Sequence, residues 1–253
     1  MIGTYLGTSL ALKLVAAPKI PDDIGGTSDR NSCLAKNGTF CTDWFDSNST
    51  LFEDALSKHI KLTLVSMVVG FLISFTLALI AYRFRWIALP VTFLSSVLYT
   101  IPAIATFYIL VGITGLKDLT AEIALVSYTL LILFTNTLAG LTGVSPDVRD
   151  AAQGLGMTAR QSLLRVELPL AIPTIVAGIR VATVTIISLV TVAGLIGLGG
   201  LGDIIYTQGV KNNTNTALIV GGVACIALAL LADAILVIAQ RLVTPWARAR
   251  RNR

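Results

Sequence analysis

The sequence predicts an all-α membrane protein with five transmembrane helices. Hydrophobic residues make up 55% of the 253 residues and charged residues only 13%, and the mean hydropathy is +0.80. A soluble domain needs more charge on its surface than this composition supplies. Five stretches contain no Asp, Glu, Lys or Arg, and each reaches the roughly 20 residues that a helix needs to cross the hydrocarbon core of a bilayer. These stretches are Leu62–Tyr82, Trp86–Leu116, Ile123–Pro146, Val181–Gly202 and Asn212–Ala232.

The distribution of Lys and Arg predicts that the N-terminus lies outside the cell and the C-terminus inside it. Cytoplasmic loops are enriched in these residues. With this orientation, the outside loops between helices hold only Lys117 and Lys211. The long N-terminal segment counts little, because its basic residues are balanced by acidic ones. The inside loops and tail hold Arg83, Arg85, Arg149, Arg160, Arg165, Arg180, Arg241, Arg248, Arg250, Arg251 and Arg253.

The net charge of +5 does not indicate a nucleic-acid partner. The basic tail directly follows a membrane helix, where it is typical of an anchor beside anionic membrane lipid. We therefore expect an extracytoplasmic segment at 1–58, a transmembrane domain at 59–246 and a basic cytoplasmic tail at 247–253. The protein is predicted to be a multi-pass protein of the cell membrane that binds no nucleic acid.

The N-terminal segment contains a short apolar stretch followed by a polar loop. Thr4–Ala17 is too short to span the membrane and is interrupted by Lys13, which favours an interfacial helix. Residues 18–50 are rich in Pro, Gly, Asp, Asn, Ser and Thr, which is typical of a loop. Cys33 and Cys41 lie in this loop outside the cytoplasm, where they form either a disulfide or two free thiols. We expect no metal site, and Cys225 in the last apolar stretch is predicted to be a small packing residue.

The first two predicted helices differ in regularity. The first, Leu62–Tyr82, ends at basic residues that precede Trp86, an interface anchor. The second contains Pro90 and Pro102, each of which removes a helical hydrogen bond and favours a kink.

Polar residues in the third and fourth helices are candidates for a translocation path. Asn136 is expected to face protein or water, because an unsatisfied amide in lipid is costly. Thr185, Ser188 and Thr191 recur every three residues and so lie near one face of their helix. Their hydroxyls either border a polar passage or bind carbonyls of their own helix or neighbouring helices.

Two further patterns have a less specific interpretation. Asp233 lies in the last apolar helix, near its cytoplasmic end, and is expected to pair with Arg241 or to reach the interface rather than to serve transport directly. The run from Gly197 to Gly202 matches the glycine pattern of dinucleotide-binding sites. That pattern requires a preceding buried strand, and here it ends a membrane helix instead.

The polar stretch 145–173 between the third and fourth helices predicts two short helices joined by a glycine turn. Ser145-Pro146 is a typical helix start, with Ser as N-cap and Pro at the first position. Gly154 and Gly156 end that helix. The pattern Thr158-x-x-Gln161 forms a capping box that starts the next one, and Leu168-Pro169 closes it.

This stretch resembles the "EAA" loop of the membrane subunits of binding-protein-dependent ABC importers. Asp150-Ala151-Ala152, Gly156, Val166 and Leu168-Pro169 occupy the family's positions, with Asp in place of Glu and Val in place of Ile. The resemblance implies that the loop is gripped by an ATP-hydrolysing partner and transmits its movement. The residues expected to contact this partner are Asp150, Ala151, Ala152, Gly154, Gly156, Arg160, Arg165, Val166, Leu168 and Pro169.

Three other segments resemble the same family. Tyr99-Thr100-Ile101-Pro102-Ala103 is similar to its "TIP" region, where a broken helix faces the pathway, although an ordinary kink explains the residues equally well. The run Gly194–Asp203 looks like a "GLGGLGD" segment that turns the chain outside in osmoprotectant and methionine importer permeases. The ending Gln240–Trp246 is similar to the terminus of quaternary-amine permeases. The resemblance covers about residues 53–246.

The resemblance implies a MetI-like type I ABC importer permease for glycine betaine, choline or carnitine. It implies a cytoplasmic ATPase dimer, a second permease subunit, identical or paralogous, and an extracytoplasmic solute-binding protein. No Walker sequence occurs in the chain, so ATP and Mg²⁺ are expected on the partner, with no cofactor and no catalytic residue here. The alternatives are a methionine or amino-acid importer permease, an ATP-independent secondary transporter and a membrane enzyme. The last two are disfavoured, because no inverted repeat and no cluster of nucleophile, base or metal ligands is visible.

Overall fold

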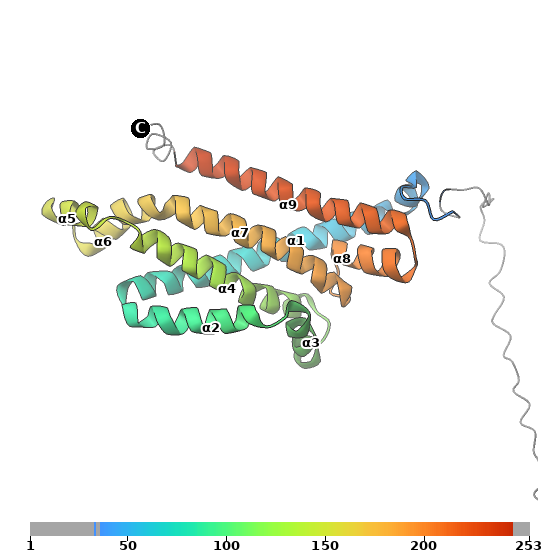
Figure 1. The fold of residues 1–253 in the computed structure, drawn as a ribbon, viewed down its shortest axis with the longest axis horizontal. Coiled ribbons are helices and arrows are strands. Elements are labelled where there is room, and N and C mark those ends of the chain that lie inside the picture. The colour runs from blue at the N-terminus through green and yellow to red at the C-terminus, as the bar shows by residue number, and fades with distance from the viewer. Residues whose placement is uncertain (1–32, 34–35, 245–253) are drawn as a thin grey trace, which may run out of the picture.

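The computed structural model describes residues 33 and 36–244, and these residues form helices and no strand (Figure 1). Four helical segments of the described chain are long and apolar enough to cross a membrane: Thr42–Arg83, Asp118–Thr142, Ala159–Leu195 and Asn215–Val243. A fifth span is reached when the bent pair Arg85–Thr100 and Ala103–Thr114 is taken as one. The fold class and the number of spans agree with the prediction. The proposed interfacial helix Thr4–Ala17 and the tail 247–253 lie outside the described residues.

The first helix, α1 (Thr42–Arg83), begins well before the apolar stretch that predicts it. Its first turn carries Asp43, which the positive end of the helix dipole stabilises. The helix is kinked at Asn48, whose side-chain amide donates a hydrogen bond of 2.8 Å to the carbonyl of Trp44. Trp44 is buried, so this amphiphilic turn packs onto the bundle. The prediction of a loop over 18–50 is therefore wrong from Thr42 onward, where the chain is helical and continuous with the first span.

The second predicted span is divided into two helices, which agrees with the broken helix that the resemblance implies and not with an ordinary kink. α2 (Ala88–Thr100) and α3 (Ala103–Thr114) are bent by 92° relative to each other. The break falls at Pro102, and Ile101 before it is extended because a proline disfavours helical geometry in the preceding residue. Pro90 lies in the first turn of α2. The N–H groups of a first turn have no partner within the helix, so the missing N–H of proline breaks no helical hydrogen bond there.

The centre of the bundle is formed by α4 (Asp118–Thr142) and α7 (Leu168–Leu195), which pack against each other and against α1. α2 and α9 (Asn215–Val243) lie on opposite edges of this centre (Figure 1). Its interior contains apolar residues from the three central helices, including Leu62, Leu125, Leu133 and Ile186. Gly178 of α7 allows a close approach to α4, because a Cβ there would lie 2.5 Å from the Cβ of Asn136.

The segment after α7 is more helical than the predicted loop. α8 (Leu201–Asp203) runs into a π-helical segment, Ile204–Lys211, before α9 begins. His59 of α1 holds this turn: its ring accepts a hydrogen bond from the backbone N–H of Leu201 at 3.3 Å and lies 3.1 Å from the carbonyl oxygen of Ile187. The side chain is fully buried. The two contacts fit a neutral imidazole with its proton on Nε2.

A disulfide between Cys33 and Cys41 closes a small loop that packs on the start of α9. The backbone N–H of Cys41 donates to the hydroxyl of Thr216 at 3.1 Å, and that hydroxyl donates to the carbonyl of Gly38 at 3.1 Å. Asn37 accepts a hydrogen bond of 2.8 Å from the backbone N–H of Asn215. The loop thus supplies acceptors to the first turn of α9, which lacks helical partners for its N–H groups. It lies at the end of the bundle opposite α5 (Pro146–Gly154) (Figure 1).

Candidate functional site

The loop between α4 and α7 folds into the two short helices that its sequence predicts. Ser145 caps α5, with its hydroxyl accepting a hydrogen bond of 3.3 Å from the backbone N–H of Asp147, and Pro146 occupies the first position. Thr158 caps α6 (Ala159–Ser162). There the backbone N–H of Thr158 donates to the side chain of Gln161 at 2.8 Å, and the N–H of Gln161 donates to the Thr158 hydroxyl at 3.4 Å. Both predicted capping arrangements are confirmed.

The turn between these helices depends on Gly156. Its φ is +77°, in the left-handed region that residues with a Cβ avoid. After the turn, the N–H of Met157 donates back to the carbonyl of Ala152 at 3.2 Å. Gly154 is the last residue of α5 and has no such backbone constraint. The turn is therefore fixed by a backbone hydrogen bond and requires a glycine at position 156.

α6 continues without interruption into the long span that follows. A π-helical turn, Leu163–Glu167, joins it to α7, and the whole helical segment runs from Ala159 to Leu195. The predicted end of the second short helix at Leu168-Pro169 is therefore wrong. Pro169 lies in the first turn of α7. The π-turn before it has already shifted the regular helical hydrogen bonds, so the missing N–H of Pro169 removes no further one. A force applied to α6 acts directly on a membrane-spanning helix.

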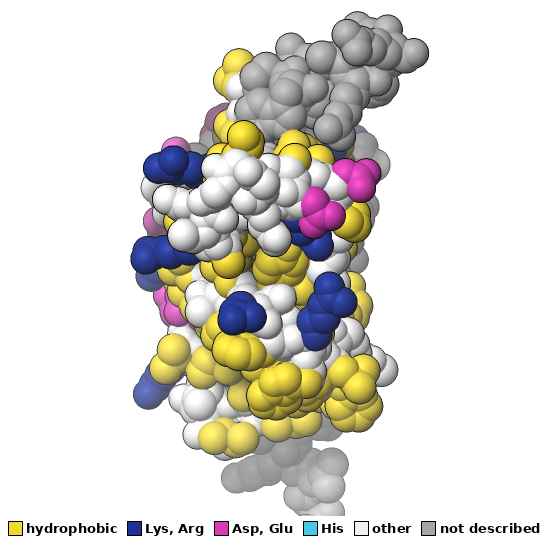
Figure 2. Space-filling model, turned by 90° about the vertical axis from the view of Figure 1, so that its left-hand side faces the viewer, with side chains coloured by type: hydrophobic (Ala, Val, Ile, Leu, Met, Phe, Trp, Pro, Cys, Tyr) yellow, Lys and Arg dark blue, Asp and Glu magenta, His cyan; other side chains and the backbone are white. Residues whose placement is uncertain are grey.

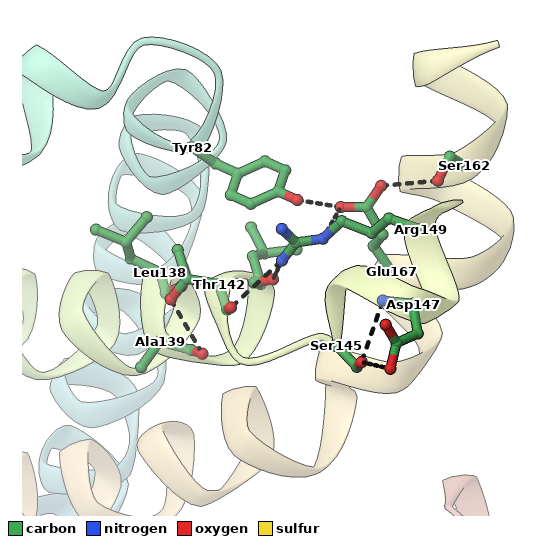
Figure 3. A network of polar contacts seen from close by, with 10 residues as sticks. Tyr82, Leu138, Ala139, Thr142, Ser145, Asp147, Arg149, Ser162 and Glu167 are labelled. Atoms are coloured by element: carbon green, nitrogen blue, oxygen red, sulfur yellow. Dashed lines mark hydrogen bonds and ion pairs between the residues drawn. The ribbon is translucent and has the colours of Figure 1, made fainter. Parts of the chain in front are cut away.

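A buried carboxylate fixes the base of this loop. Glu167 is 6% exposed and accepts hydrogen bonds from the hydroxyl of Tyr82, at the end of α1, and from the hydroxyl of Ser162 at 2.8 Å (Figure 3). Arg149 of α5 brings its Nε to 3.7 Å from the same carboxylate. A buried charge is tolerated only when it is paired and hydrogen-bonded, and Glu167 has both kinds of partner.

Arg149 also binds the end of α4. Its Nη2 donates to the carbonyl oxygens of Leu141 at 3.1 Å and Thr142 at 3.3 Å, in the last turn of α4 (Figure 3). Its guanidinium carbon lies 5.7 Å from the ring centroid of Tyr82. Arg149, Glu167 and Tyr82, which we call the base cluster, therefore join α1, α4, α5 and the start of α7. The sequence predicts none of these contacts, because the partners are far apart along the chain.

The outer surface of the loop presents most of the residues predicted to contact a partner. Figure 2 looks onto this end of the molecule and shows Lys and Arg side chains distributed across it beside exposed hydrophobic side chains. Leu155, between Gly154 and Gly156, is 78% exposed, and it is not among the residues that the sequence predicts to contact a partner. An apolar residue flanked by glycines in a polar loop is the signal that could have indicated it. Asp150, Ala151, Gly154, Gly156, Arg160 and Arg165 are exposed, Val166, Leu168 and Pro169 are half-buried, and Ala152 is buried.

A groove of about 540 Å³ lies beside the base cluster. Its lining includes the side chains of Arg83 at the end of α1, Arg85 in the short helical turn that follows and Arg160 from α6, together with Arg149. The concentration of guanidinium groups makes this end of the molecule suited to acidic side chains of a partner.

The residues predicted to border a path lie in three places. Tyr99 and Thr100 are exposed at the bend between α2 and α3, and Pro102 forms the bend itself. Asn136 is half-buried and donates to the carbonyl of Ile132 at 2.7 Å. Within the described part of the chain, no hydrogen bond joins one of these predicted residues to another. Each hydroxyl of the α7 set donates to a carbonyl four residues earlier, Thr185 to Val181, Ser188 to Val184 and Thr191 to Ile187.

The acidic residue in the last span pairs with a different helix from the one expected. The carboxylate of Asp233 accepts hydrogen bonds from Arg180 of α7, from Nε at 2.8 Å and from Nη2 at 3.0 Å. The expected partner was Arg241, on the same helix as Asp233. Packing of α9 along α7 brings Arg180 to the carboxylate, a contact that no local pattern indicates.

Comparison with known proteins identifies relatives of the chain. Residues 67–249 match the family described as binding-protein-dependent transport system inner membrane component. The choline transport system permease protein OpuBB of Bacillus subtilis is 33% identical over 188 residues, which cover 74% of this chain and 86% of that protein. The osmoprotectant import permease protein OsmW of Salmonella typhimurium is 34% identical over 193 residues, covering 74% and 89%. An inward-facing structure of the MetNI methionine ABC transporter matches with a TM-score of 0.70 at 20% identity and covers 78% of this chain and 97% of the matched chain.

Proposed function

The chain belongs to the family of binding-protein-dependent transport system inner membrane components, and from this premise we propose that it is the permease subunit of an ABC importer for a compact quaternary amine such as glycine betaine, choline or carnitine. The observation that carries the proposal is the match to choline and osmoprotectant permeases over about three quarters of the chain. The methionine transporter supports the fold alone, because its identity is 20%. A methionine or other amino-acid importer is therefore the less favoured assignment.

We assign the loop 145–173, which we call the coupling loop, as the contact for a separate ATPase subunit. Three features support this role: an exposed apex at Leu155, a base held by buried hydrogen bonds, and a helix that continues from Ala159 into the membrane. A movement of the ATPase can reach the span only through a rigid connection, and the base cluster supplies rigidity. ATP and Mg²⁺ bind the partner in this scheme, and two ATPases act on two permease subunits.

The complete transporter includes a second permease subunit, identical or paralogous, and an extracytoplasmic solute-binding protein. Closure of the ATPases on ATP draws the two coupling loops together, and hydrolysis releases them, which shifts the permease pair between two conformations. The excess of arginine at the coupling-loop end supports an orientation with this end in the cytoplasm and the disulfide loop outside.

Transport and co-purification test the assignment together. Cells that produce the chain with its ATPase and binding protein should accumulate radiolabelled glycine betaine or choline, and the ATPase should co-purify with the chain. Loss of ATPase activity should abolish uptake, while the chain remains in the membrane. Uptake that persists without the ATPase would show a secondary carrier, and uptake of methionine alone would show an amino-acid permease.

A further inference from the structure

The ion pair between α7 and α9 lies deep within the apolar part of the molecule. Arg180 lies about 18 Å beyond Leu168 along α7 at roughly 1.5 Å per residue, and Asp233 lies about 15 Å before Val243 along α9. Both distances are well inside the roughly 30 Å thickness of a hydrocarbon core, so the pair lies within the two spans and Arg180 is not in the inside loop to which the charge pattern assigns it. Two parallel hydrogen bonds of 2.8 Å and 3.0 Å join the side chains. This is the strong bidentate geometry of an arginine and a carboxylate.

The pair is open on one side. The side chains of Arg180 and Asp233 are 32% and 35% exposed, and they line a groove of about 400 Å³ with Val181, Val184 and Thr185. Charged groups in a membrane span face protein or a water-filled cavity, because exposure to lipid costs several kcal/mol. We therefore expect this groove to face protein or water, and not lipid, in the assembled transporter.

A second groove on the same pair of helices has the opposite character. It lies between α1, α7 and α9, and its lining is apolar apart from Thr63 and Thr183. It therefore provides an internal comparison, because Val68 of this groove and Val181 of the charged groove are each 57% exposed. Both valines also lie near the middle of their spans. The two grooves differ in charge rather than in accessibility or depth.

We propose that Arg180 and Asp233 line the translocation route and bind the passing solute through its charged groups, an inference that rests on the proposed function. The two bonds to Asp233 use only part of the five N–H donors of a guanidinium, so Arg180 can also bind a carboxylate of the solute. Asp233 then faces the solute's quaternary ammonium. A zwitterion with both groups on a short chain, such as glycine betaine, matches the pair, whereas choline lacks the carboxylate.

Polar side chains continue from the pair along α7. Thr185 lines the same groove, and Ser188, one turn further on, is exposed. Their hydroxyl protons are used in bonds to the helix backbone, but the oxygen atoms keep acceptor capacity for water. The Arg180–Asp233 pair is therefore the charged part of a longer polar surface on α7, and not an isolated contact.

Thiol labelling tests whether the groove contains water. Val181→Cys and Val68→Cys would each be made with Cys225→Ala, and the transporter assembled with its ATPase would be placed in lipid nanodiscs. A water-soluble, membrane-impermeant charged thiol reagent should modify Cys at position 181 at least about tenfold faster than at position 68, because a thiol in lipid stays protonated and unreactive. Equal rates, or no reaction at position 181, would overturn the proposal. The Cys33–Cys41 disulfide stays unreactive as long as no reductant is added.

Uptake selectivity tests the role of the charges. The double variant Arg180→Gln with Asp233→Asn removes both charges, so neither is left uncompensated. Uptake of glycine betaine should fall about tenfold more than uptake of choline, because both solutes lose the contact with Asp233 but only betaine also loses the charge-assisted hydrogen bond to Arg180. Equal changes for both solutes, or retained betaine uptake, would overturn the proposal. If the wild-type transporter carries neither solute, the proposed function fails, and the labelling result still decides whether the groove is wet.

Discussion

The Nε of Arg149 lies 3.7 Å from a carboxylate oxygen of Glu167, at the point where the coupling loop meets the membrane spans. Arg149 is in α5 and Glu167 is in the π-turn before α7, so the contact closes the loop at its base. The same carboxylate binds Tyr82 of α1, and the same guanidinium binds the last carbonyls of α4. The orientation of the loop is therefore set by three spans rather than by one.

Glu167→Gln should weaken this base without removing the side chain. Hydrogen bonds to a charged group contribute about 1.5–3 kcal/mol, and the variant loses the charge that Tyr82, Ser162 and Arg149 share. We expect membrane insertion to be normal and ATP hydrolysis per solute transported to rise about tenfold. The measurement is uptake and ATPase activity of the same reconstituted transporter. Tyr82→Phe, which removes a single partner, should show a smaller change in the same direction, and an unchanged ratio in both variants would refute a coupling role.

Gly156 offers a test of the turn. Gly154 and Gly156 both have open space where a Cβ would lie, but only Gly156 has a positive φ, of +77°. Gly156→Ala should therefore cost about 1–2 kcal/mol of local stability, whereas Gly154→Ala should be nearly neutral. Gly156→Trp adds bulk to the docking surface as well, and it should abolish uptake while ATP hydrolysis continues. Normal uptake in Gly156→Trp, at membrane levels matching the wild type, would contradict the coupling assignment.

Leu155 should carry part of the affinity for the ATPase. Its side chain is 78% exposed at the tip of the loop, and burying a leucine contributes about 1.5–3 kcal/mol. Leu155→Asp should reduce the ATPase that co-purifies with the permease about tenfold or more. The matched control is Leu116→Asp, a leucine that is 61% exposed in the loop between α3 and α4. The proposed contact would be wrong if both variants lost the ATPase equally, or if neither did.

Local signals in the sequence predict the elements of this site well. Ser145-Pro146, Thr158 with Gln161, and Gly156 each act on the backbone within a few residues, so their effect can be read without knowing the fold. The same holds for the spans, whose length and lack of charge are local properties. The end of the second helix is different, because α6 continues through a π-turn and the proline lies within the first turn of α7.

Contacts between distant residues could not be predicted in this way. Tyr82 and Glu167 meet because α1 ends where α7 begins. Arg180 meets Asp233 because α9 lies along α7. A proline predicts a kink, but the 92° bend between α2 and α3 also depends on α4, where Tyr128 donates a hydrogen bond to the carbonyl of Ile101. Depth of burial likewise needs the tertiary structure, as His59 shows.

His59 should be a stability residue rather than a transport residue. Replacement by Ala leaves the N–H of Leu201 without its acceptor and opens a cavity at a fully buried position. The two effects together should cost about 3 kcal/mol or more. Thermal unfolding in detergent should show a clear fall in Tm for His59→Ala. Lys61→Ala on the same turn of α1 removes only an exposed ion pair with Asp118 and should change stability by less than about 1 kcal/mol, so a similar fall in both variants would argue against the role of His59.

The disulfide loop provides a direct test of orientation. Cys33 and Cys41 lie at the end of the bundle opposite the coupling loop, so an extracytoplasmic N-terminal segment requires a cytoplasmic coupling loop. After mild reduction of intact cells, a membrane-impermeant thiol reagent should label Cys33, which is partly exposed, in a Cys225→Ala chain. Arg165→Cys, in a chain that lacks the other three cysteines, should be labelled only after lysis, because Arg165 is exposed on the coupling-loop side. The reverse pattern would place the coupling loop outside, where no ATP-hydrolysing partner could reach it, and the proposed mechanism would fail with the orientation.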